Sequence, residues 1–369
     1  MTITANQLSS SAAGISEAAT GTLVLPTPQQ CRQQHALSST DAALVCDQRE
    51  AIGSVLKGED PRLMVVVGPC SVHSVEQALH YAEELAGVVP QFDDALLIAM
   101  RVYIEKPRTT VGWRGLALDP LLDASQGPEL GLRESRRVMK GVIERGLPVA
   151  TESLDPLITP YVEDLLAFST LGARTSESQT HRQMAAAMAC PIGVKNATSG
   201  NLSVAADAVK SLGASQTVLQ VLPDGRVGCK NVNGNHNTAI VLRGGAAGPN
   251  YGSPHQSEAR RLLQHHQVND GVIVDCSHGN SDKVADNQNR VVQYVCQQLR
   301  NGAAAPVGVM IESNLHAGKQ PFGPLSSLQY GVSVTDECLG FDDTVSCLET
   351  LAAAVRERMP LEPAPLASV

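Results

Sequence analysis

The 369-residue chain has no excess of positive charge: 28 lysine and arginine residues stand against 37 aspartate and glutamate residues, and the net charge is -9. A field of this sign repels the phosphate backbone of nucleic acids, which argues against DNA or RNA as a partner. Any phosphate-binding function must therefore come from a local cluster of basic side chains.

Targeting and membrane segments are also missing from the sequence. No lysine or arginine precedes Arg32, so the basic region of a signal peptide and the arginines of a transit peptide are absent. No apolar run approaches the roughly 20 residues that span a bilayer. We therefore expect a cytoplasmic protein with no membrane partner.

Cysteine pairs of the metal-binding or redox kind do not occur. The 9 cysteines are scattered, and no two of them form a CxxC motif. This pattern favours free thiols in a reducing compartment over disulfides. With 43% hydrophobic residues, the chain can still build a large core without cross-links.

Short β-branched runs alternate with helical patterns from about residue 62 onwards. The predicted strands are residues 63–67, 97–102, 148–151, 170–173, 192–195, 217–221, 272–275 and 307–311. Several of them are apolar throughout, which is typical of strands that are buried on both faces. The pattern predicts an α/β protein with a (β/α)8 TIM barrel, and a doubly wound open sheet is the alternative.

The expected catalytic barrel covers residues 61–358. Asp224-Gly225 and Asn233-Gly234 are hairpin-turn signals, so we predict an inserted β-hairpin at about residues 222–242, after the sixth strand. Residues 29–60 form an N-terminal extension with an expected role in oligomer formation or regulation. Residues 1–28, rich in Ser and Ala, and the Pro-rich residues 359–369 are expected to be flexible ends.

Basic side chains gather at the predicted strand ends, where barrel enzymes place their chemistry. Each one alone could be a surface ion pair, but six cations at one mouth would repel one another unless an anion bound there. Arginine matches phosphate and carboxylate oxygens, and lysine adds a mobile charge. The cluster is large enough for two phosphates and a carboxylate, and its members are Arg101, Lys106, Arg108, Arg174, Lys195 and Arg243.

A second group at the strand ends offers metal ligands: Cys70, His278, Glu312 and Asp336. A thiolate, an imidazole and two carboxylates suit one divalent transition metal, and Mn, Fe, Co and Zn all fit. Taken singly, Cys70 could be a buried thiol and His278 a core histidine. Glu152, at the end of the third strand, could orient a reactant or cap a loop, and Lys195 could form a Schiff base.

Eight segments resemble the type I family of 3-deoxy-D-arabino-heptulosonate 7-phosphate (DAHP) synthases, the kind inhibited by an aromatic amino acid. The resemblance begins at about residue 30, and KPRTTVGW is its most specific motif, since generic barrels and related sugar-acid synthases lack it. The segments are GPCSVHS (68–74), MRVYIEKPRTTVGWRGL (100–116), GARTSESQTHR (172–182), GVKNATSGN (193–201), LRGG (242–245), DCSHGNSDK (275–283), GVMIESNL (308–315) and SVTDECLGFDDT (333–344).

The resemblance implies a C–C bond-forming transferase of the shikimate pathway, which condenses phosphoenolpyruvate, erythrose 4-phosphate and water into DAHP and phosphate. It implies that Lys106 and Glu152 are catalytic and that Cys70, His278, Glu312 and Asp336 bind the metal. The implied phosphoenolpyruvate site is Arg101, Lys106, Glu152, Arg174, Lys195 and Arg243. The implied erythrose 4-phosphate site is Lys106, Arg108, Thr109 and Asp336.

Regulation is also implied by the resemblance. The family's inhibitor pocket lies beside the barrel, near the N-terminal extension and the hairpin, and one of its positions corresponds to Ala189. Because alanine lacks a hydroxyl, this position argues against phenylalanine; tyrosine is favoured, tryptophan comes next, and a feedback-insensitive enzyme is the alternative. A homodimer or homotetramer is expected.

Three competing functions follow from the same residues. One is a related synthase that uses arabinose 5-phosphate, against which the KPRTTVGW motif argues. Another is a non-catalytic amino-acid sensor, which would have lost a metal ligand or a phosphate-binding arginine. The third is a Schiff-base aldolase that uses Lys195.

Overall fold

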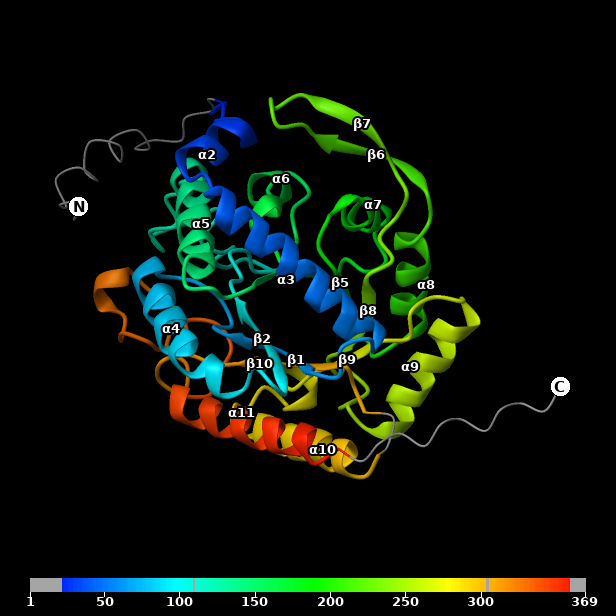
Figure 1. The fold of residues 1–369 in the computed structure, drawn as a ribbon. Helices are drawn as coiled ribbons and strands as arrows, with labels where there is room; N and C mark the ends of the chain where they lie inside the picture. Colours follow the sequence, from blue (N-terminus) through cyan, green and yellow to red (C-terminus); the bar gives the residue numbers. More distant parts are fainter. Residues whose placement is uncertain (1–21, 109, 303–304, 359–369) are drawn as a thin grey trace.

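The computed structural model describes residues 22–108, 110–302 and 305–358. Its centre is a closed barrel of parallel strands, in which β1 pairs with both β2 and β10 (Figure 1). The predicted TIM barrel is confirmed, and this closure excludes the open sheet. The barrel strands are β1 (Leu63–Gly68), β2 (Leu96–Arg101), β3 (Val149–Glu152), β4 (Phe168–Leu171), β5 (Ile192–Lys195), β8 (Thr238–Leu242), β9 (Val272–Asp275) and β10 (Gly308–Glu312).

Helices surround the barrel and bury its outer face. They are α4 (Val75–Val88), α5 (Pro128–Ile143), α6 (Thr159–Val162), α7 (Gln179–Ala187), α8 (Ser203–Leu212), α9 (Ser253–His265), α10 (Asn287–Arg300) and α11 (Phe341–Arg356). Short 3-10 turns lie at Val89–Gln91, Glu163–Leu165, His278–Asn280 and Leu325–Ser327. The start of α4 illustrates the local cause: Ser74 caps it by accepting a hydrogen bond from the Gln77 amide. No helix in the described ranges is long and apolar enough to cross a membrane.

The barrel interior is a packed core of its own. Alternate strand residues such as Met64, Val66 and Phe168 point into it, while their neighbours pack against the helices. Burial on both faces explains why the strands are apolar throughout. Gly193 makes room for the Phe168 ring in the interior, because a Cβ there would lie 2.9 Å from Cζ of Phe168.

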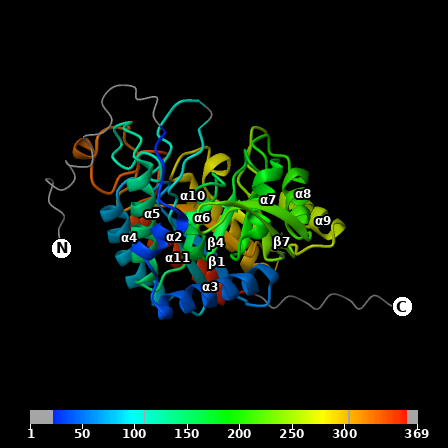
Figure 2. The same ribbon diagram turned by 90° about the horizontal axis from the view of Figure 1, so that it is seen from above.

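The N-terminal extension closes one end of the barrel. It contains α2 (Pro28–Gln34) and α3 (Ser39–Lys57), and α3 crosses the barrel at the N-terminal ends of its strands (Figures 1 and 2). Ile52 and Leu56 of α3 belong to the same apolar cluster as the interior strand residues. The opposite end, where the strands finish, is therefore the open mouth. The predicted flexible ends, apart from residues 22–28, lie outside the described residues.

The predicted hairpin exists, but its expected position after the sixth strand was wrong. The structure forms it from β6 (Gln216–Val221) and β7 (Val227–Val232), an antiparallel pair outside the barrel, before the sixth barrel strand. That strand is β8, which pairs with β5 and β9. The burial patterns explain the difference, because β8 is buried at every position whereas β6 is buried only at Val218.

Candidate active site

The strand ends place charged side chains inside the barrel mouth. The two-residue period of a strand decides this: Ala99 lines the interior, so Arg101 does too, and Ile273 places Asp275 in the same way. Charges in such a position require partners, since burial of a lone charge is costly. The buried members of this group are Arg101, Glu152, Lys195, Asp275 and Glu312.

One terminal nitrogen of the Arg101 guanidinium is paired with a protein carboxylate, and the other is not. Nη2 lies 3.0 Å from Oε1 of Glu312, and both side chains are buried. The guanidinium carbon lies 4.0 Å from the ring centre of Tyr103, a cation–π contact. Nη1 finds no hydrogen-bond partner among the described residues. A buried N–H of this kind fits an anionic oxygen supplied by a ligand.

Lys195 and Glu152 form a buried ion pair across the mouth. Burial favours the neutral amine, but the charges of Glu152, Tyr103 and Asp275 together outweigh this effect, so the pKa of Lys195 is raised. A Schiff-base lysine needs a lowered pKa, and this pairing therefore argues against the aldolase hypothesis. Gly172 leaves space for the carboxylate, because a Cβ there would lie 2.7 Å from Oε1 of Glu152.

Three of the four predicted metal ligands come together. The ligand atoms of Cys70, Glu312 and Asp336 lie within 4.8 Å of one another. His278 stands beside this group, with Nε2 3.7 Å from Oε1 of Glu312, and its Nδ1 lies 3.0 Å from Oδ2 of Asp275. Sulfur, oxygen and nitrogen donors together could hold a divalent transition metal, with Asp275 orienting the imidazole from behind.

The electrostatics of this group favour a cation. Burial, and then the Glu312 carboxylate, raise the pKa of the Cys70 thiol to about 11. Lys106 partly opposes them, since its Nζ lies 3.1 Å from both Sγ and the carbonyl oxygen of Cys70. Burial by itself would lower the pKa of the Lys106 amine. The neighbouring Cys70, Glu312 and Asp336 together raise this pKa by more, so the net shift is upward and the amine stays protonated. The same amine can therefore donate a proton at the mouth.

The remaining cationic residues lie around the mouth. A cavity of about 660 Å³ is lined by Lys106, Arg108, Arg114 and Arg174. Arg243 follows β8, and its carbonyl accepts a hydrogen bond of 3.1 Å from the Gly279 amide, next to His278. Thr109, which was also predicted to bind substrate, lies outside the described residues.

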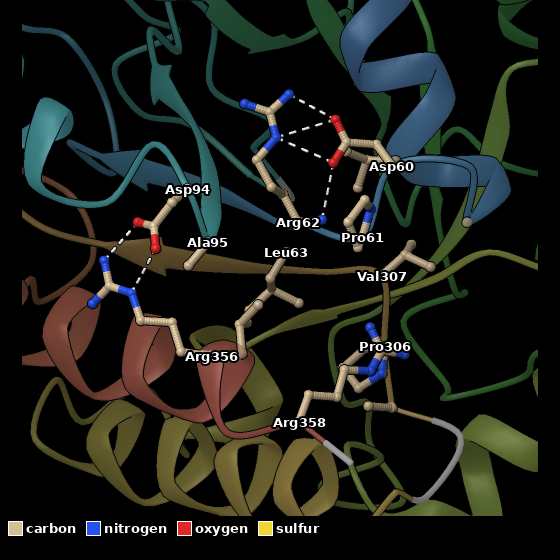
Figure 3. A pocket seen from close by; sticks show the side chains of 14 residues that line it. Asp60, Pro61, Arg62, Leu63, Asp94, Ala95, Pro306, Val307, Arg356 and Arg358 are labelled. Carbon is tan, nitrogen blue, oxygen red and sulfur yellow. Dashed lines mark hydrogen bonds and ion pairs between the residues drawn. The ribbon is translucent and has the colours of Figure 1, made fainter. Parts of the chain in front are cut away.

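A second cavity, of about 530 Å³, lies near the N-terminal ends of β1 and β2 (Figure 3). Two of its three arginines already have carboxylate partners: Arg62 contacts Asp60 and Arg356 contacts Asp94, both at 2.6 Å. Barrel active sites lie at the other end of the strands. The mouth is therefore the stronger candidate for anion binding.

Ala189 lies in the exposed turn between α7 and β5. Asn235, which follows the hairpin, donates to the carbonyls of Met188 and Cys190 at 3.2 and 2.9 Å, so it holds this turn from both sides. The extension reaches the same hairpin, because the Gln29 amide donates to the Pro223 carbonyl at 2.8 Å. The extension thus contacts the hairpin turn, and the Ala189 turn contacts the segment that follows the hairpin, while the role of Ala189 stays a prediction.

Residues 33–349 match the DAHP synthetase I family. The chain belongs to this family. It is 41% identical over 329 residues to "Phospho-2-dehydro-3-deoxyheptonate aldolase, Tyr-sensitive" of Escherichia coli, covering 89% of this chain and 92% of that protein. It is 43% identical over 334 residues to the Trp-sensitive aldolase of Salmonella typhi, covering 90% and 96%. The solved phospho-2-dehydro-3-deoxyheptonate aldolase of Francisella tularensis has a TM-score of 0.90 and 41% identity, covering 93% of this chain and 100% of that one.

Sequence reasoning assigned no role to three residues that support the barrel mouth. Asp275 ends β9, so its strand position was the signal that could have found it. Tyr103 stacks on Arg101, and its ring is also 5.3 Å from Nζ of Lys195. Gln288 exchanges two hydrogen bonds of 2.9 Å with the backbone of Glu312. No local signal marks Gln288, because it lies inside a helix.

Glu105 is a further buried acid at the barrel mouth, with 6% of its surface exposed. Burial and the neighbouring Asp155 raise its pKa from 4.5 to about 8. Between these values the folded protein keeps a proton that the unfolded chain has lost. The Glu105 contribution to stability therefore falls as pH rises through this window.

We expect the difference in melting temperature between the Glu105→Gln variant and the wild type to be more positive at pH 8 than at pH 5. Glutamine stays neutral and avoids the cost of ionising a buried acid. Differential scanning fluorimetry across this range measures the difference, with Glu349→Gln, at an exposed position of α11, as the control. A difference that does not change with pH would contradict the raised pKa.

Proposed function

We propose that this chain condenses phosphoenolpyruvate with erythrose 4-phosphate and water to give DAHP and phosphate, the first step of aromatic amino-acid biosynthesis. The observation that carries the proposal is that the Cys70–Glu312–Asp336 group and the basic residues Lys106 and Arg101 meet at one barrel mouth. Membership of the DAHP synthetase I family supports the same reaction.

The phosphoenolpyruvate side of the proposed site is Arg101, Lys106, Glu152, Arg174, Lys195 and Arg243. Its guanidinium and ammonium groups suit the phosphate and the carboxylate of this substrate. The unpartnered Nη1 of Arg101 is one donor ready for a ligand oxygen. Glu152, fixed by Lys195, orients the water that adds at C2 of the substrate.

The aldose side is Lys106, Arg108, Thr109 and Asp336. C3 of phosphoenolpyruvate attacks the aldehyde carbon, and Lys106 protonates the oxygen as negative charge develops on it. Water then adds at C2, the C2–O bond to the phosphate breaks, and inorganic phosphate leaves. Arg174, Lys195 and Arg243 stabilise the charge on that leaving group.

Cys70, His278, Glu312 and Asp336 fit one divalent ion, and we propose Mn, Fe, Co or Zn. Their mixture of soft and hard donors, gathered within a few ångströms, is the supporting observation. When bound, such an ion supplies Lewis-acid polarisation of the aldehyde carbonyl.

We also propose inhibition by an aromatic amino acid, with tyrosine favoured, at a pocket formed by the extension, the hairpin and the Ala189 turn. The missing hydroxyl at Ala189 supports tyrosine over phenylalanine. Relatives of similar identity are named both Tyr-sensitive and Trp-sensitive, so tryptophan comes next. A homodimer or homotetramer is the assembly that we propose.

A steady-state assay tests the reaction. Purified protein, supplied with each of the four metals in turn, receives phosphoenolpyruvate with either erythrose 4-phosphate or arabinose 5-phosphate. We expect DAHP and phosphate in equal amounts from erythrose 4-phosphate only, and the strongest inhibition by tyrosine among the three aromatic amino acids. Folded protein that turns over neither aldose would overturn the enzyme proposal and favour a sensor, and turnover of arabinose 5-phosphate alone would identify the related synthase.

A further inference from the structure

The backbone of one residue at the mouth, Leu154, is held by side chains from two other segments. The Leu154 amide donates to Oε2 of Glu105 at 3.4 Å, and Nε2 of His181 lies 2.7 Å from the Leu154 carbonyl oxygen. Because a carbonyl only accepts, Nε2 carries a proton, and in the neutral ring Nδ1 then accepts from the Ser178 hydroxyl at 2.8 Å. We call these contacts the Leu154 clamp.

The Leu154 clamp joins three segments that carry proposed substrate residues. Glu105 directly precedes Lys106 in the loop after β2, and Leu154 follows Glu152 by two residues at the end of β3. His181 lies in α7, which follows the loop after β4. One cavity of about 660 Å³ is lined by Glu105, Leu154 and His181 together with Lys106, Arg108 and Arg174.

The packing below Glu105 leaves it little freedom to move. The backbone amide of Leu154 donates to its buried carboxyl group. Gly115 has φ of +109°, and a Cβ there would lie 2.6 Å from Cα of Glu105. The chain can therefore approach Glu105 this closely only because residue 115 is glycine. A rigid anchor of this kind can set the position of the next residue, Lys106.

We propose that Glu105 and His181 are positioning residues, which hold the Lys106 loop at a fixed separation from the strand end that carries Glu152. The inference rests on the proposed condensation, in which Lys106 protonates the aldehyde oxygen and Glu152 orients the water. Neither Glu105 nor His181 needs to touch a substrate for this role. Their hydrogen bonds act on the Leu154 backbone, and through it on the relative placement of the two substrates.

Loss of the clamp should affect the use of erythrose 4-phosphate more than the binding of phosphoenolpyruvate. Displacements of about 1 Å can cost about 100-fold in rate, so we expect kcat to fall about 10- to 100-fold in the Glu105→Ala and His181→Leu variants. The KM for erythrose 4-phosphate should rise. The KM for phosphoenolpyruvate should rise less, because Arg101 and Lys195 of its proposed site have their own partners, Glu312 and Glu152.

Conservative variants separate positioning from other roles. Glu105→Gln keeps an oxygen that accepts from the Leu154 amide, and His181→Gln keeps a side-chain N–H that can reach the carbonyl. Both should recover most of the lost kcat. His266→Ala is the matched control, because His266 also uses Nε2 in a polar contact, 3.0 Å from Asp207, but lies at the end of α9. Steady-state kinetics with each substrate varied, together with melting temperatures, supply the readouts.

The outcomes distinguish this inference from the proposed function. Wild-type protein that does not condense the two substrates would refute both. An active wild type whose folded Glu105→Ala and His181→Leu variants keep normal kcat and KM would refute the clamp alone. The clamp would also be refuted if the two glutamine variants, with wild-type melting temperatures, lost as much kcat as Glu105→Ala and His181→Leu. Should Glu105→Ala fail to fold, the half-buried His181 still provides the test through its two variants.

Discussion

Replacing Lys106 with methionine should lower kcat for DAHP formation by about 10²- to 10⁴-fold, the range expected when a general acid is removed. The Lys106 ammonium lies 3.1 Å from the Cys70 thiol, among the candidate metal ligands, and its neighbours raise its pKa. It is therefore charged and close to the proposed aldehyde site. Methionine has a similar length but carries neither a charge nor a proton.

The fold of this variant should survive. An apolar side chain that replaces a half-buried ammonium does not leave an unpaired charge behind, and such exchanges are often neutral for stability. Circular dichroism and the melting temperature check this, while the steady-state assay measures kcat. Lys210→Met is the control, since Lys210 is exposed on α8 and donates to the His266 carbonyl. Near-normal turnover of folded Lys106→Met protein would exclude the proposed proton transfer.

Removal of the proposed divalent metal is expected to abolish turnover. The Cys70, Glu312 and Asp336 ligand atoms lie within 4.8 Å of one another, and two of these residues are carboxylates that repel when both are ionised. A divalent ion relieves this repulsion and, when bound, polarises the aldehyde carbonyl. We therefore expect background activity after dialysis against a chelator, and recovery when Mn, Fe, Co or Zn is added.

Two cysteine substitutions, one at a proposed ligand and one as a control, make this measurement specific. Cys70→Ala removes one proposed ligand and should require a higher metal concentration for half-maximal activity, because ligand loss weakens binding. Cys46→Ala is the control, since Cys46 is an exposed free thiol on α3. Metal content is measured by mass spectrometry beside the activity. Full activity in protein shown to be metal-free would remove the metal from the proposed mechanism.

The position of most site residues followed from local physics. Strands buried on both faces are apolar throughout, so the sequence predicts them, and their two-residue period sends the last inward side chain into the mouth. Arg101 and Lys195 illustrate this, because each ends a barrel strand and points into the interior behind Ala99 or Gly193. The barrel and the existence of the hairpin were predictable for similar reasons, whereas the closure of one barrel end by the extension was not predicted.

The sixth strand was less predictable, because two β-branched runs compete for it. Residues 217–221 and 238–242 both have strand character, and local propensity does not reveal which of them is buried. Only the pairing of β8 with β5 and β9 decides between them, and this pairing depends on contacts far apart in the chain. The half-buried β6 is left to form the external hairpin with β7.

The sequence alone thus determined the barrel and the residues at its strand ends, because alternation and burial are local properties of each strand. The tertiary structure decided which of these residues meet: Cys70 and Asp336 lie 266 positions apart in sequence, yet their side chains are 3.7 Å apart. It also decided the supporting contacts, such as the cluster of Trp113, Leu122 and Val334, which packs the Lys106 loop against the Asp336 loop. Such contacts depend on the closure of the barrel, and no local sequence pattern encodes them.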